Sequence, residues 1–151
     1  MLFRGRGVVS SLIRWQTRSA YSHAALLDVE GRVIEAKEGR GVIRRPAEWV
    51  YAEAAESGVE IEAYGVRGAT GIVWWEALEF AASQLGVGYD YLAIARFISR
   101  RKHRNRNRWF CSELVFASLA YGGIRLLERI DDSEVSPGLL AISPLMEPKR
   151  I

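Results

Sequence analysis

The sequence predicts one α+β domain of 151 residues, and three observations lead to this fold class. Short segments with strand patterns occupy the first part of the chain, and longer segments with helical spacing follow them. This order is typical of α+β proteins and differs from the strand–helix alternation of parallel sheets. Hydrophobic residues make up 49% of the chain, which suffices for a core, and no internal repeat or linker divides it. We therefore expect an antiparallel sheet with one face covered by helices.

Each expected element has its own local signal, either a period of two for strands or a period near 3.6 for helices. The expected strands are residues 2–4, 22–27, 32–37, 41–45 and 59–66. The expected helices are residues 8–16, 46–55, 71–86, 89–99 and about 110–121. The helix over 8–16 carries Val8, Leu12 and Trp15 on one side. Prolines interrupt residues 136–148, so we expect this tail to run as an extended segment.

Composition excludes several classes of protein. The chain has no apolar run long enough for a membrane span and no signal-peptide pattern, so we expect synthesis as a cytoplasmic protein. The single cysteine excludes an internal disulfide and a cysteine-rich zinc site. No phosphate loop, metal-ligand spacing or nucleotide fingerprint occurs, so we expect neither a metal nor a cofactor.

The positive charge is concentrated in one segment, residues 100–108. This basic run holds Arg100, Arg101, Lys102, Arg104, Arg106 and Arg108. The net charge of the whole chain is +3, so the chain without these six cations carries 3 − 6 = −3. The run is either a solvated loop or a patch that attracts an anionic surface or polymer. Binding of nucleic acid is a further possibility, and a steep salt dependence of binding would reveal it.

Cys111 lies at the expected start of the helix over 110–121, on a face that continues through Leu114, Val115 and Ser118. This apolar face predicts that Cys111 points into the body of the protein. One reading is a buried cysteine that only fills space. The other is a nucleophile, because the first turn of a helix offers unpaired N–H groups and a positive dipole end that favour a thiolate and an oxyanion. Glu113 suits a helix start through the dipole alone.

A thiolate nucleophile requires a base, and the chain has two histidines. His103 lies inside the basic run, which depresses its pKa and offers no fixed scaffold. His23 lies on an expected strand, in the segment "YSHAALL". Taken alone, a histidine on a strand is usually a half-buried residue with a structural hydrogen bond.

Three segments together, "YSHAALL", "RVIEA" and "WFCSELV", resemble the circularly permuted NlpC/P60 papain-like hydrolases, and more closely their YiiX-like branch. The opening "LFRGRG" and the closing "SPGLLAISP" are similar to that branch too, so the resemblance covers nearly the whole chain. It implies a small barrel-like sheet packed on helices, with Cys111 as nucleophile, His23 as general base and Glu35 as the group that orients the imidazole. Tyr21, Tyr89 and Tyr91 are candidates for an oxyanion or substrate contact.

The resemblance implies a cysteine peptidase or amidase that cleaves a cell-wall peptide or another small amide. A lipid-directed acyltransferase or thioesterase and a non-catalytic binding module are the alternatives. A cell-wall substrate would require release by lysis or transport by a phage-like particle.

The register of the first hairpin decides between the carboxylates near His23. A two-residue turn would pair positions whose numbers sum to 61 and place Glu38 opposite His23. A three-residue turn ending at Gly31 makes paired positions sum to 60, so that Glu35 lies diagonally from His23 and Asp28 opposes Arg32. Gly31 suits the left-handed residue of that turn, and Asp28 with Arg32 is a favourable charge pair. The sequence therefore predicts Glu35 as the partner of His23.

Overall fold

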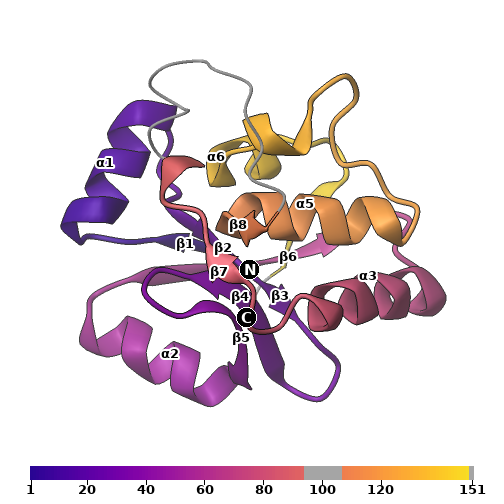
Figure 1. Ribbon diagram of the computed structural model, residues 1–151, viewed down its shortest axis with the longest axis horizontal. Coiled ribbons are helices and arrows are strands. Elements are labelled where there is room, and N and C mark those ends of the chain that lie inside the picture. The colour runs from indigo at the N-terminus through magenta and orange to yellow at the C-terminus, as the bar shows by residue number, and fades with distance from the viewer. Residues whose placement is uncertain (94–106, 150–151) are drawn as a thin grey trace.

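The computed structural model describes residues 1–93 and 107–149, which form an α+β fold built on small, mainly antiparallel sheets (Figure 1). The strands are β1 (Leu2–Arg4), β2 (His23–Ala24), β3 (Leu26–Leu27), β4 (Arg32–Lys37), β5 (Gly41–Pro46), β6 (Glu60–Val66), β7 (Gly88–Tyr89), β8 (Arg108–Trp109) and β9 (Met146–Lys149). The helices are α1 (Val8–Thr17), α2 (Ala47–Glu56), α3 (Gly71–Ser83), α5 (Cys111–Tyr121), α6 (Pro137–Ala141) and the short 3₁₀ helix η1 (Asp132–Glu134).

Seven of the nine described strands form two antiparallel sheets that meet at one continuous stretch of chain, and β7 and β8 form a separate parallel pair. One sheet has the order β2-β1-β6-β9, and the other has the order β3-β4-β5. Only Ala25 separates β2 from β3. Its N–H donates to the Met1 carbonyl at 3.0 Å, and its carbonyl accepts from the amino group of Met1 at 2.9 Å. The expected strand over 22–27 therefore exists, but it changes partner midway, from β1 to β4.

Helices cover the strands from two sides, whereas we expected helices on one face only. Figure 1 shows α2 on the opposite side of the central strands from α5. Alternation along each strand explains this arrangement. In β4, Ile34 and Ala36 belong to the larger core with α3 and α5, whereas Val33 belongs to a second core that includes Val50 of α2. Both faces are apolar, so both need cover.

The tail differs from the extended segment that we expected. Ser136 begins α6, because its hydroxyl accepts a hydrogen bond from the Leu139 N–H at 3.2 Å, and Pro137 occupies the first turn. Proline is favourable at that position, since its missing N–H has no partner there anyway. Further on, β9 pairs with β6 at the edge of its sheet, where Pro148 is tolerated.

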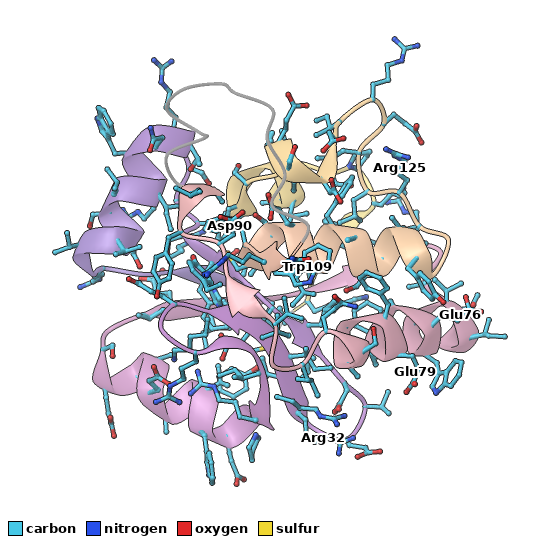
Figure 2. The ribbon with its side chains drawn as sticks, viewed as in Figure 1. Arg32, Glu76, Glu79, Asp90, Trp109 and Arg125 are labelled. Atoms are coloured by element: carbon cyan, nitrogen blue, oxygen red, sulfur yellow. The ribbon has the colours of Figure 1, made fainter. Side chains whose placement is uncertain are left out.

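Two other expectations need correction or lie outside the described residues. The helix expected over 89–99 does not begin at Tyr89, because Gly88 and Tyr89 pair in parallel with Arg108 and Trp109. The Asp90 N–H donates to the Trp109 carbonyl at 3.0 Å, and Figure 2 shows both residues near the start of α5. Residues 94–106, and with them Arg100–Arg106 of the basic run, lie outside the described residues.

The turn into β5 supplies a test of the packing. Gly39 and Gly41 both have positive φ angles, of 75° and 74°. A Cβ at Gly41 would lie 2.4 Å from the Val87 carbonyl oxygen, whereas a Cβ at Gly39 would meet open space. Gly39→Ala should therefore cost only the backbone strain, about 1–2 kcal/mol, and Gly41→Ala should cost about 1–3 kcal/mol more. Urea unfolding measures both. Equal losses would show that the contact with Val87 is not constraining.

Candidate functional site

His23 lies where two sheets and a helix meet. It begins β2 and pairs with Phe3 of β1, whose ring packs edge-on against the imidazole with centroids 5.0 Å apart. Its side chain is 22% exposed, so one side of the ring still reaches solvent. Packing against Phe3 thus holds the imidazole in place, while part of the ring remains accessible to solvent.

Glu35 fixes the other side of His23. Its Oε2 accepts a hydrogen bond from His23 Nε2 at 2.6 Å, and its Oε1 accepts one from Arg45 Nε at 2.7 Å. The Glu35 side chain is only 2% exposed, so these partners take the place of water. A buried carboxylate needs such partners, because an unpaired charge is costly away from solvent.

The strand register creates this contact, and it is the register that we predicted. Leu26 pairs with Ile34 and Leu27 with Val33, so that paired positions sum to 60. Gly31 has a φ of 73°, and Arg32 Nε donates to Asp28 Oδ2 at 2.9 Å. Both local signals therefore appear as expected.

Cys111 is the first residue of α5, and it is fully buried. The predicted inward face of this helix is confirmed, because Leu114, Val115 and Ser118 are buried too. Glu113 contributes more than its favourable interaction with the dipole, since its carboxylate accepts a hydrogen bond from the Phe110 N–H at 3.1 Å. This bond secures the start of the helix and so fixes the position of Cys111.

His23 is hydrogen-bonded to Glu35 and also interacts electrostatically with the Cys111 side chain. Burial opposes a positive charge on His23, but the Cys111 sulfur and the Glu35 carboxylate together raise the pKa of His23 from 6.5 to about 10. Burial likewise opposes the charge of Glu35, yet His23 and Arg45 lower its pKa to about 2. The site therefore favours the protonated, imidazolium form of His23.

Only Tyr89 among the three candidate tyrosines lies near the sulfur. Burial and the neighbouring Cys111 both raise the pKa of its hydroxyl, so Tyr89 stays neutral and able to donate a hydrogen bond. Tyr21 instead bonds to Glu62 and to Tyr64. The Tyr91 hydroxyl accepts from the Gly39 N–H at 2.8 Å. Tyr21 and Tyr91 are therefore engaged elsewhere.

A pocket of about 200 Å³ leads to His23 and Glu35. Its apolar wall comes from β1, α1, α2 and the chain that follows α2: Phe3, Val9, Ile13, Val50, Ala54 and Val59. The charged residues Lys37, Glu38, Arg45 and Glu53 line it together with His23 and Glu35, and Tyr89 and three serines, Ser10, Ser22 and Ser57, line it too. Cys111 does not line the pocket and has no exposed surface. A substrate must therefore displace the covering side chains to reach the sulfur.

One site residue was missed by the sequence analysis, and one predicted residue has a different role. Arg45 was not predicted, although the hairpin places it diagonally from Glu35: Ile43 pairs with Glu35, and Arg45 lies two residues further on the same face. Arg108 belongs to β8, where its guanidinium donates to the Tyr89 carbonyl at 3.1 Å, so it supports the site's backbone. Within residues 1–93 and 107–149, no group of three acidic, histidine or cysteine side chains converges to hold a metal ion.

The coupling between His23 and Cys111 predicts an unusual titration. In a His103→Gln background, which leaves one histidine, NMR should show the His23 ring protonated until the pH approaches 10. Because the pKa of His23 is raised in the folded state, the protonated ring stabilises the fold. This contribution to folding stability is complete below pH 6.5 and is lost as the pH rises towards 10. Cys111→Ala should lower the pKa of His23, since the side chain that helps to raise it is gone. A pKa near 6.5 in the unmutated site would contradict this coupling.

Comparison with known proteins adds no assignment to this geometry: the chain matches no protein-family model and no curated protein sequence.

Proposed function

We propose that the protein is a cysteine hydrolase in which Cys111 is the nucleophile, His23 the general base and acid, and Glu35 the group that orients His23. The observation that carries this proposal is the position of His23, which interacts electrostatically with the Cys111 side chain and is hydrogen-bonded through Nε2 to Glu35 at 2.6 Å. A nucleophile, a base and an orienting group in this sequence of contacts form the general arrangement for covalent acyl transfer.

The reaction follows from these contacts. The Cys111 thiolate attacks the carbonyl carbon of an amide or ester, and the first-turn N–H groups of α5 stabilise the oxyanion. His23 gives its proton to the leaving amine or alcohol as the bond to carbon breaks, which leaves a thioester on Cys111. Water then attacks the thioester while His23 accepts its proton, and the acid is released with Cys111 restored. Tyr89 is a second donor for the oxyanion, because its hydroxyl remains protonated beside the sulfur.

The order of the three residues supports assignment to the permuted NlpC/P60 papain-like hydrolases. His23 and Glu35 lie on strands early in the chain, and Cys111 begins a helix late in it. This is the order that the resemblance implies, and the opposite of ordinary papain-like enzymes. We propose the YiiX-like branch, with a small amide such as a cell-wall peptide as the first substrate class.

A lipid acyl ester or thioester is the second candidate, and the pocket favours it. Six apolar side chains line the pocket, together with His23 and the charged groups that surround it. An acyl chain would bury its methylene groups against this wall, at about 0.8 kcal/mol for each, and present its carbonyl near His23. Ser10, Ser22 and Ser57 also line the pocket and would offer a peptide polar contacts.

Turnover of paired model substrates tests the proposal and separates the two classes. We expect Cys111→Ser to lower hydrolysis of p-nitrophenyl esters by at least about 10³-fold, and Glu35→Gln by about 10²-fold because the imidazole loses its orientation. Glu38→Gln removes the carboxylate that the alternative register would have placed opposite His23, and it should lower the rate of hydrolysis far less. Thermal melting of each variant controls for folding.

Comparison of octanoyl with acetyl esters, and of both with a dipeptide p-nitroanilide, then ranks the substrate classes. A clear preference for octanoyl would favour the lipid substrate, and a preference for the anilide would favour the peptide. Full activity in Cys111→Ser would refute the proposed nucleophile. Inactivity of the unmutated protein on every substrate would support the non-catalytic binding module.

A further inference from the structure

The outer side of α1 is apolar and uncovered. Val8, Leu12 and Trp15 occur at a helical spacing of four and three residues, and they are 89%, 41% and 75% exposed. The opposite side of the same helix packs inward: Ile13 is buried, and Val9 lines the pocket that leads to His23. The helix therefore has two apolar sides, and only one of them is used by the fold.

Positive charge surrounds this outer side. The first 27 residues contain four arginines, Arg4, Arg6, Arg14 and Arg18, and no carboxylate. Arg4 is paired with Glu60 and Glu62. Among the described residues, no ion pair engages Arg6, Arg14 or Arg18, and Arg14 donates only to the Gly5 carbonyl, at 2.9 Å. A shallow depression beside the apolar stripe is lined by Ser11, Arg14, Trp15, Arg18, Ser19 and Ala20.

The exposed apolar side chains of α2 and α3 differ from those of α1, because they have acidic neighbours. On α3, Ile72 and Trp75 are 68% and 61% exposed, and Figure 2 shows Glu76 and Glu79 projecting outward from the same helix. On α2, exposed Trp49 follows Glu48 directly. An anionic partner would be repelled by both helices and attracted by α1.

We propose that α1 binds the surface of an anionic lipid bilayer, lying parallel to it. Val8, Leu12 and Trp15 enter the boundary between head groups and acyl chains, where tryptophan is favourable. Arg6 and Arg18 contact lipid phosphates, and the depression beside Trp15 accepts a head group through Arg14 and Arg18. No helix in the described part of the chain has the length and apolarity to cross a bilayer, which agrees with a helix that lies on the surface.

This binding surface and the pocket share one helix. Val9, Ser10 and Ile13 form part of the pocket wall, and the lipid-facing stripe lies on the other side of α1. Binding would therefore hold the apolar pocket next to the membrane, but the binding itself does not depend on the proposed chemistry at Cys111.

Sedimentation with vesicles tests the proposal. We expect the protein to sediment with phosphatidylcholine vesicles that contain phosphatidylserine, much less with pure phosphatidylcholine, and less as salt increases. Leu12→Gln with Trp15→Gln should abolish binding. Arg6→Gln with Arg18→Gln should weaken it roughly 30-fold, at about fivefold for each arginine. The matched control is Ile72→Gln with Trp75→Gln on α3, which should bind as the unmutated protein does. Cys111→Ser should also bind normally, so failure of the catalytic proposal remains distinguishable.

Three results would overturn the proposal. The first is equal binding of the α1 variants and the unmutated protein. The second is binding that is lost only when the cations of residues 100–106 are replaced, which would assign it to the basic run. The third is self-association without lipid that both the α1 and the α3 variants abolish. Such a result would show that α1 of one copy binds the acidic helix α3 of another copy, and not a bilayer.

Discussion

Burial of the Glu35 carboxylate is the constraint on which the site depends. Both of its oxygens are used, one by Nε2 of His23 and the other by Nε of Arg45. Removal of one partner from a buried pair costs about 3–5 kcal/mol, because the remaining charge is then uncompensated. Arg45 is held in turn by Glu53 of α2, and Glu53 also accepts from Lys37. The chain of contacts thus ties α2 to the hairpin and fixes the orientation of the imidazole from below, while Cys111 approaches from α5.

The fold brings these groups together through strand alternation and one change of strand partner. His23 and Glu35 belong to adjacent stretches of the sheet, and Cys111 belongs to the helix that packs on its other face. Because the strand over 23–27 passes from β1 to β4, His23 lies near the junction of the two sheets, where α5 can reach it. The consequence is a histidine whose Nε2 is bonded to a carboxylate and whose ring also interacts with the Cys111 side chain.

Much of this arrangement follows from local signals in the sequence. Gly31, with its left-handed turn, and the pair of Asp28 with Arg32 determine the register that selects Glu35, and the apolar face of α5 directs Cys111 inward. Other features depend on tertiary contacts that local patterns do not encode. Ile13 is buried, whereas the more regular stripe of Val8, Leu12 and Trp15 is exposed. The prolines of the tail predicted an extended chain, but Pro137 starts a helix because Ser136 precedes it. The role of Arg45 could be predicted only from the pairing of β4 with β5, which places Arg45 diagonally from Glu35.

The central claim is that Cys111 accepts the acyl group with His23 as its base, and mass spectrometry of the quenched enzyme tests it most directly. The intact protein is mixed with p-nitrophenyl acetate, stopped in acid within the first turnovers, digested and analysed. The account predicts one acetyl group on the peptide that contains Cys111, and its loss in His23→Ala. Hydrolysis that proceeds with no acyl group on Cys111, or with the acyl group on another residue, would contradict it.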